Sequence, residues 1–233
     1  MNNTLQLPPI LDFNETSNKG TLFDTRDGQS YKVVKIGKQI WTAENFRYLP
    51  PNEEEPPLYN YGKFENDQQL LFGRYYNYKT ATKIAPEGWH LPTKEDFIEL
   101  FKFILNDNNF ILDPPQTQLT LTNKKFIIDT FNPEQYPYLS IYLRHKPNTP
   151  KPSPYDGYDK YGFNLLCSPY FYNPEHLQGL FSFSNSSFLW FQQDNISIKT
   201  NKYIGAIKIN LDKVSFAISN PASDFFNVRL IKN

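Results

Sequence analysis

The residue types that most often carry catalysis or bind metal ions are few in this chain and far apart. The histidines are His90, His145 and His176, and the single cysteine is Cys167. Zinc ligands follow characteristic short spacings or have carboxylate partners, and these three histidines show neither pattern. We therefore expect each histidine to have a structural or surface role, and we predict no metal site.

Cys167 lies in the apolar run FNLLCSPY. A cysteine nucleophile needs a nearby base and an electropositive setting, whereas this run is typical of a small buried residue in a strand. A lone cysteine also excludes an intramolecular disulfide. The chain contains no GxSxG, phosphate-binding or dinucleotide-binding motif. We expect no catalytic residues and no enzyme activity.

Charge and hydropathy exclude further classes of partner. The chain of 233 residues has 24 basic and 24 acidic residues, so no overall field attracts nucleic acid or an anionic membrane. Its start has neither a basic nor an apolar signal-peptide region, and no apolar run is long enough to span a bilayer. We expect a cytoplasmic protein as written, or a surface or extracellular one if a leader was removed or another export route is used.

The first half of the chain predicts strands and then helices. Residues 1–19 are polar and include Pro8 and Pro9, which indicates an extended N-terminal arm. Residues 20–46 contain the turn signals Asp27-Gly28 and Gly37-Lys38 between apolar runs, which predicts a meander of three strands. Residues 49–57 form a proline-bracketed acidic loop, and residues 72–84 have the spacing of one short helix.

A second helix is predicted to begin after Thr93. Thr93 is a good N-cap, Asp96 occupies the third helical position, and the helix is expected to end near residues 106–109. Its apolar residues recur with helical spacing and predict a buried face made of Phe97, Leu100, Phe101, Ile104 and Leu105.

The second half of the chain predicts strands again. The segments LTLTNKKFIIDTF and YLSIYLR have strand-like composition, whereas the proline-rich stretch around 146–161 is expected to be an insertion without regular structure. From Tyr161 onward, short apolar runs alternate with Gly, Asn, Ser and Pro. This order of strands, two helices and strands favours a single α+β domain over residues 20–233.

Two stretches resemble the Fibrobacter succinogenes major paralogous domain, a bacterial family with C-type-lectin-like features. They are DGQSYKVVKIGKQIWTAENFR, Asp27–Arg47, and GRYYNYKTATKIAPEGWHLPTKEDF, Gly73–Phe97. Weaker similarity lies in YGFNLL, FSFSNSS and the closing FFNVRLIKN. Two departures are Leu230, where the family often has cysteine, and the proline-rich insertion, where it is typically glycine-rich.

The resemblance implies a C-type-lectin-like fold, with small antiparallel sheets, two flanking helices, long loops, and N- and C-terminal strands close together. It implies that PEGWHLPT is a scaffold corner with Trp89 in the core, Thr93 capping the helix, and His90 hydrogen-bonded. The structural motif residues are Trp41, Pro86, Gly88, Trp89, His90, Pro92 and Thr93.

A lectin-like fold also raises the question of calcium, which sugar-binding members hold with clustered oxygen ligands. Asn173, Pro174 and Glu175 have that composition in an inverted order. The run QDN at 193–195, which comes after Trp190, is only loosely similar to the Trp-Asn-Asp strand of those lectins. Asp156 and Asp159 lie in a turn-like run. We interpret all three segments as polar turns and expect no cofactor; calcium is the alternative that stays open, without support from these residues.

Aromatic residues make up 17% of the chain, which fits either an aromatic core or a recognition surface. Our leading hypothesis is a non-catalytic binding module for a protein, or a glycan, with Tyr155, Tyr158 and Trp190 as anchors on loops 49–61, 146–161 and 185–201. Trp190 has equal claim to a place in the core. The alternative hypothesis is a structural subunit of a larger bacterial assembly, such as a contractile injection machine. An enzyme of unknown class ranks third.

Overall fold

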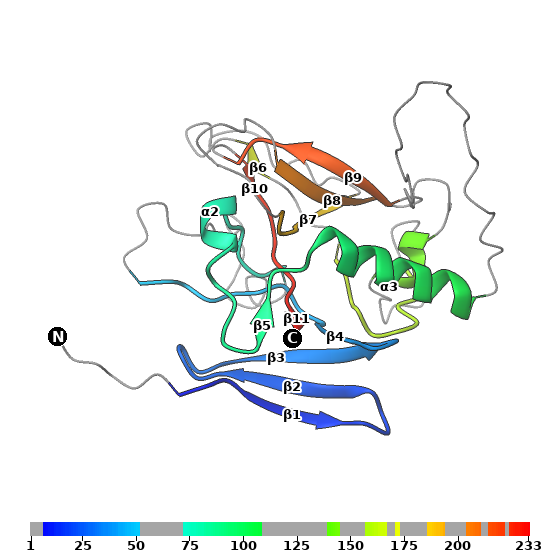
Figure 1. Cartoon of the computed structure of the whole chain (residues 1–233), viewed down its shortest axis with the longest axis horizontal. Helices are drawn as coiled ribbons and strands as arrows, with labels where there is room; N and C mark the ends of the chain where they lie inside the picture. The colour runs from blue at the N-terminus through cyan, green and yellow to red at the C-terminus, as the bar shows by residue number, and fades with distance from the viewer. Residues whose placement is uncertain are drawn as a thin grey trace, which may run out of the picture.

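The computed structural model describes residues 7–51, 72–108, 139–144, 157–166, 171–172, 186–193, 204–210, 214–221 and 224–233. Its strands form a six-stranded, a three-stranded and a two-stranded sheet, and the strand pairs within them are antiparallel. Figure 1 shows β1–β3 on one side of the molecule and β7–β9 on the other, with the C-terminal segment running between them. These sheets and the few helices confirm an α+β architecture.

The N-terminal strands form the meander that the sequence predicts, with one strand more. The predicted three strands are β2 (Lys19–Asp24), β3 (Gln29–Ile36) and β4 (Gln39–Thr42). They are preceded by β1 (Ile10–Asn14), which pairs with β2 in the register Ile10↔Phe23 to Asn14↔Lys19. The interpretation of residues 10–14 as part of an extended arm was therefore wrong, because the ILDFN run places Leu11 and Phe13 against the core.

The six-stranded sheet is completed by two strands from distant parts of the chain. β11 (Ile231–Lys232) lies between β4 and β5 (Trp89–His90), so the strand order is β1-β2-β3-β4-β11-β5. Ile231 pairs with Trp41 on one side and with His90 on the other. The closing strand therefore lies directly beside the strand that carries the IW motif.

The long helix α3 (Lys94–Asp107) confirms the prediction in its capping and its buried face. The side chain of Thr93 accepts a hydrogen bond from the backbone N–H of Asp96 (3.1 Å), and the Asp96 carboxylate accepts one from the backbone N–H of Thr93 (2.8 Å). The five predicted apolar residues are all buried. None of the helices in the described part of the chain is long and apolar enough to cross a membrane.

The first predicted helix is much shorter than residues 72–84. Helix α2 comprises only Tyr78–Ala81, with Asn77 as its N-cap. Tyr76 lies before it in an isolated bridge to Phe226. The tyrosines of this segment are thus divided between strand-like pairing and one turn of helix.

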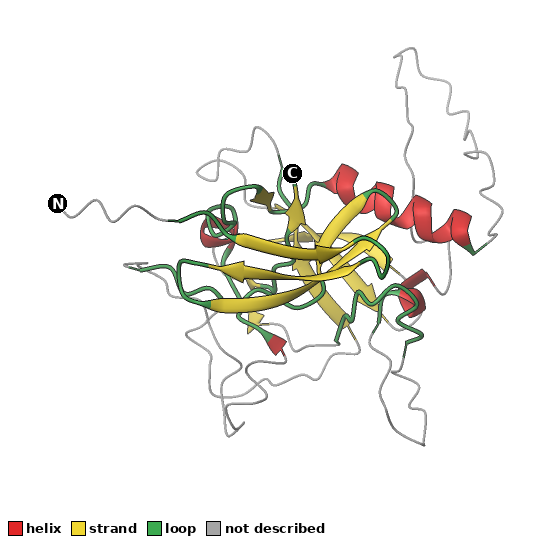
Figure 2. Cartoon of the chain, turned by 90° about the horizontal axis from the view of Figure 1, so that it is seen from below, coloured by secondary structure: helices red, strands yellow, loops and turns green. Residues whose placement is uncertain are grey.

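The second half of the chain forms the smaller sheets, which Figure 2 shows from another side. β7 (Ser186–Trp190), β8 (Ile204–Asn210) and β9 (Val214–Ser219) make one sheet, and β6 (Phe171–Tyr172) pairs with β10 (Asp224–Phe225). Of the two further runs with strand-like composition, the described part of YLSIYLR, residues 139–144, begins with the 3₁₀ helix η2 (Leu139–Tyr142), so that prediction was wrong. Leu139 and Leu143, the residue directly after η2, are both buried and are four apart, which suits a helical turn packed on a core better than a strand. Residues 119–131 lie outside the described residues.

The core consists mainly of two apolar clusters. The first joins α3 to residues of β3, β4, β7, β8 and η2, with Trp41 at 5.1 Å from Phe97 and 5.7 Å from Phe163 between ring centroids. The second joins the inner face of the meander to α2, the PEGW corner and the C-terminal segment. Leu11 and Phe13 of β1 pack on the rim of this second cluster.

Candidate binding site

Trp190 is a core residue and not a surface anchor. Its side chain is fully buried, its ring centroid lies 4.4 Å from that of Phe226, and its indole N–H donates to the backbone oxygen of Tyr76 over 2.6 Å. β7 is buried at every position, so both of its faces are covered. The prediction of Trp190 as a binding residue was therefore wrong.

Tyr158 presents an exposed ring, and 62% of the residue is accessible to solvent. Its backbone N–H donates to the oxygen of Ile141 over 2.7 Å, which ties this part of the loop to η2. Its ring lies at a tilted angle to Tyr142, with 6.3 Å between centroids. Tyr155 lies outside the described residues.

The predicted scaffold corner joins three elements. Gly88 adopts a φ of +76°, which favours glycine, and the N–H of Trp89 donates to the oxygen of Pro86 over 3.0 Å. Trp89 is buried in the second cluster. The two ring nitrogens of His90 face Asn233 Oδ1 and, at 3.2 Å, Asp96 Oδ2. His90 therefore makes hydrogen bonds at this corner to both the closing strand and the start of α3.

The other polar candidates fall into two groups. Asp159 has a φ of +41° and accepts a hydrogen bond from the backbone N–H of Asn164 over 2.7 Å, which is a turn-forming role. The second group lies outside the described residues: His145, Asp156, Cys167, residues 173–175, His176 and residues 194–195. Within the described ranges, no group of three or more His, Cys, Asp or Glu residues is placed to hold a metal ion.

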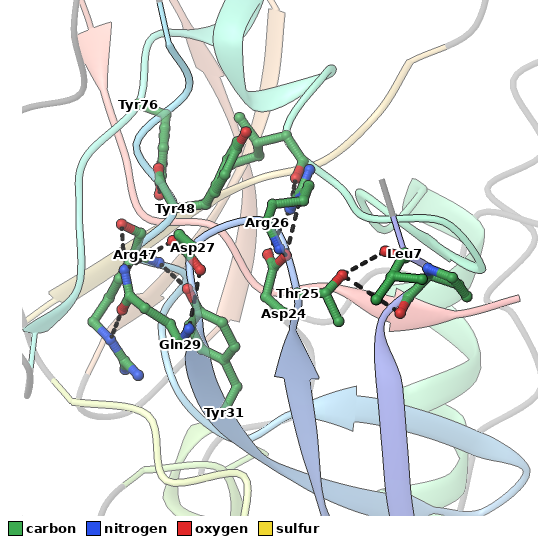
Figure 3. Close-up of polar contacts among 12 residues, drawn as sticks. Leu7, Asp24, Thr25, Arg26, Asp27, Gln29, Tyr31, Arg47, Tyr48 and Tyr76 are labelled. Atoms are coloured by element: carbon green, nitrogen blue, oxygen red, sulfur yellow. Dashed lines mark hydrogen bonds and ion pairs between the residues drawn. The ribbon is translucent and has the colours of Figure 1, made fainter. Parts of the chain in front are cut away.

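A hollow lies where the N-terminal segment, the β2–β3 turn and the PEGW corner meet. Figure 3 shows Leu7, Thr25 and Asp24 close together at this place. Its volume is about 220 Å³, and its walls are residues 7–9, 24–26 and 85–87. The hydroxyl of Thr25 donates to the backbone oxygen of Leu7, which holds the N-terminal segment against the turn. Three prolines contribute rigid backbone to the lining, Pro8, Pro9 and Pro86, although the accessible surface of the hollow is mainly polar.

A buried ion pair forms the polar part of the hollow. Asp24 is fully buried, and its two carboxylate oxygens accept hydrogen bonds from Arg26 Nε (2.8 Å) and Nη2 (2.7 Å). Arg26 Nη2 also donates to the oxygen of Ile84 over 2.8 Å, and the guanidinium carbon lies 3.9 Å from the ring centroid of Tyr48. Burial opposes the charge of Arg26, but the hydrogen bond and charge of Asp24 outweigh it, so the pKa of Arg26 is raised.

A second arginine, Arg47, lies to the left of this pair in Figure 3. Arg47 Nε donates to Gln29 Oε1 over 2.9 Å, and its guanidinium carbon lies 4.5 Å from the ring centroid of Tyr31. The hydroxyl of Tyr31 accepts a hydrogen bond from the backbone N–H of Arg47 over 3.1 Å. Burial raises the pKa of Tyr31 well above its ordinary value. These contacts fix the β2–β3 turn to the segment that follows β4.

The chemistry of the hollow suits contact with a ligand better than proton transfer. Asp24 neutralises Arg26 within the protein, and both groups are occupied by hydrogen bonds. Leu7 at the wall of the hollow is exposed to 70%. Ile10 and Phe23 are exposed to 59% and 38% and lie directly opposite one another on the outer face of the sheet, because Phe23 and the buried Asp24 point to opposite faces. Exposed apolar pairs of this kind are candidate contacts for a partner.

The hollow was not predicted from the sequence. The run DTRDG indicates a turn but not which segments Arg26 reaches, because Ile84 is 58 residues away. One usable signal was the alternation of apolar and polar residues in ILDFN, which is typical of a half-buried strand.

The chain is similar to a known protein family over most of the described fold. No curated protein and no solved structure matches the chain significantly. The family profile of the Fibrobacter succinogenes major domain matches residues 34–232, which include β4 and every later element of the described chain. β1, β2 and two of the three walls of the hollow precede the matched region. The chain therefore belongs to the Fibrobacter succinogenes major domain family.

Proposed function

We propose that this protein is a non-catalytic binding module whose ligand is another protein. The observation that carries this proposal is the exposed apolar pair Ile10 and Phe23, directly opposite one another on β1 and β2, with the exposed Leu7 nearby along the chain at the wall of the hollow. Apolar side chains held on a rigid sheet lose little conformational freedom on binding, so their burial favours association.

The scaffold is proposed to be C-type-lectin-like, as the resemblance implied. This is supported by the contact between the first motif stretch and the closing strand, where β11 lies beside β4. No cofactor forms part of the proposed function, so binding is expected to be equal with calcium and with a chelator.

A photo-crosslinking experiment tests the location of the binding surface. A photoreactive phenylalanine analogue replaces Phe23 in the full chain, which is then illuminated in its native cells. The same analogue at Glu99, an exposed position on α3, is the matched control. We expect one major protein adduct from position 23 and none from position 99.

The same photoreactive analogue at position 158 distinguishes the two candidate surfaces, which are the one around Phe23 and the loop that carries Tyr158. If position 158 gives the adduct and position 23 does not, the binding surface is the tyrosine loop predicted from the sequence. An adduct sensitive to glycosidase would identify a glycan, and an adduct of two copies of this chain would favour a structural subunit. Absence of any adduct at positions 23 and 158 would overturn the binding function.

A further inference from the structure

β1 leaves a row of backbone hydrogen-bonding groups unused at the edge of the sheet. The N–H of Lys35 donates to the oxygen of Asn18 over 2.9 Å, and these residues are opposite one another in the β2–β3 register. Hydrogen-bonded pairs alternate along antiparallel strands, so the even-numbered residues of β2 bond to β3 and the odd-numbered ones bond to β1. The backbone groups of Ile10, Asp12 and Asn14 therefore point toward β2.

It follows that the N–H and C=O groups of Leu11 and Phe13 point away from the sheet. β1 is the terminal strand in the sheet order, and no described segment pairs with its outer side. Figure 1 shows this strand at the border of the molecule. Unpaired edge groups are a template for another strand, and strand addition is a recurring mode of peptide recognition.

The two faces of β1 differ in chemistry. The inward side chains Leu11 and Phe13 are half-buried and pack on the rim of the second core cluster. The outward side chains Ile10 and Asp12 are exposed, and Asp12 lies opposite the uncharged Thr21. Among the described residues, the Asp12 carboxylate makes no ion pair and no hydrogen bond within the chain.

The one charged side chain of β1 itself is the carboxylate of Asp12. The positive side chain of Lys19 lies opposite Asn14 on β2, one strand behind the free edge. Glu87 is exposed at the wall of the hollow and, like Asp12, has no ion-pair partner in the described ranges. Arg26, the positive group of the hollow, is neutralised by Asp24. A ligand strand with lysine or arginine on its outer face is therefore complementary to this surface.

A second copy of this chain is a poor occupant. Antiparallel pairing of two β1 strands over all five residues places Asp12 opposite Asp12, and like charges directly opposite destabilise a strand pair. Pro8 and Pro9 lack an N–H and so shorten the edge available beyond Ile10.

We propose that the free edge of β1 accepts an extended basic segment of a partner protein as an additional strand. This names the partner of the surface to which the proposed function assigns binding. The segment bonds to the backbone of Leu11 and Phe13, places apolar side chains on the inner face, and places a basic side chain beside Asp12. Its end lies over the hollow, where Glu87 provides a second carboxylate.

A pair of synthetic peptides tests the edge directly. One peptide alternates valine with lysine over six residues, and the other alternates valine with glutamate. We expect the lysine peptide to slow amide exchange of Leu11 and Phe13 in the full chain, and to bind roughly two- to fivefold more tightly than the glutamate peptide. Asp12→Lys is expected to reverse that preference. An unchanged preference, or protection spread over the whole sheet, would overturn strand addition.

A proline substitution separates backbone pairing from side-chain contact. Because the N–H of Leu11 points outward, Leu11→Pro removes an edge donor without removing a β1–β2 hydrogen bond. Leu11→Ala is the matched control for loss of the side chain. We expect Leu11→Pro to weaken the lysine peptide at least about fivefold relative to Leu11→Ala, with Ile10, Asp12 and Asn14 amides still protected in both.

The same variant distinguishes failure of this inference from failure of the proposed function. If the adduct formed at position 23 in cells persists at full yield in Leu11→Pro, the protein binds its partner without strand addition. If the adduct is lost in Leu11→Pro and kept in Leu11→Ala, strand addition is supported.

Discussion

Arg229 Nε donates a hydrogen bond to Asn45 Oδ1 over 2.7 Å, which joins the closing segment to the AEN motif 184 residues earlier. Arg229 Nη1 donates to the backbone oxygens of Thr42 and Phe163, both at 3.0 Å, and Nη2 donates to that of Asn164 at 3.2 Å. The guanidinium is buried and forms no ion pair with any described carboxylate. Burial lowers the pKa of Arg229 to about 9, although Glu44 and Asp159 act in the opposite direction.

The first prediction concerns this buried arginine. Arg229→Lys is expected to lower the free energy of unfolding by about 2–4 kcal/mol, because an ammonium cannot reach the four acceptors of the planar guanidinium. Asn45→Ala is expected to cost about 1–3 kcal/mol, because it leaves a buried charged donor unpaired. Urea unfolding of both variants measures these losses. Glu99→Ala, which changes an exposed residue, is the control. If Arg229→Lys and Asn45→Ala lower the free energy of unfolding no more than Glu99→Ala does, the structural role of Arg229 is contradicted.

The second prediction is a pH dependence from Tyr31. Its pKa is raised by burial, so below the ordinary tyrosine pKa of about 10 the phenol is protonated in both the folded and the unfolded state. As pH rises above that value, only the unfolded state ionises, and stability is lost. Tyr31→Phe is expected to lose less stability than the wild type between pH about 9 and about 11. The lowered pKa of Arg229 affects the pH dependence of the wild type and of Tyr31→Phe equally, so it cancels in the comparison. The prediction would be contradicted if the free energies of unfolding of the two proteins fell in parallel over this pH range.

The third prediction compares two neighbouring carboxylates. Asp24→Asn is expected to destabilise the protein by about 1–3 kcal/mol, because the largely buried Arg26 loses its charged partner. Asp27→Asn changes an exposed residue and is expected to stay within about 0.5 kcal/mol of the wild type. Thermal and urea unfolding measure both changes. Equal effects of the two variants would show that the ion pair adds nothing to stability.

The fourth prediction concerns the attachment of β1. A Cβ atom on Gly20 would lie 2.3 Å from the backbone oxygen of Asp12, so Gly20→Ala requires β1 to move. We expect a loss of about 1–3 kcal/mol and faster amide exchange at Ile10, Asp12 and Asn14. Gly28→Ala is the control, since a Cβ there meets nothing within 4 Å and is disfavoured only by the φ of +74°. Slow exchange at the three β1 amides in Gly20→Ala would contradict this account.

Local signals predicted a large part of the fold. The turns at Gly28 and Gly37, the capping box of Thr93 and Asp96, and the buried face of α3 depend on residues within a few positions of one another. The motifs around Trp41 and Trp89 were specific enough to indicate the family, whose profile matches residues 34–232. Periodicity alone did not reveal η2, because its four residues, LSIY, are too few to distinguish a strand from a helical turn.

The sequence by itself determined the elements whose hydrogen bonds close within a few residues, and it determined the family. Only the tertiary structure decided that Trp190 is buried, that Arg229 reaches Asn45, and that Arg26 reaches Ile84 at the wall of a hollow. Trp190 bonds to Tyr76 across 114 residues, and no local pattern states which segment will cover a given face. Burial and partner choice arise from packing between distant segments, so they are properties of the folded chain and not of any stretch within it.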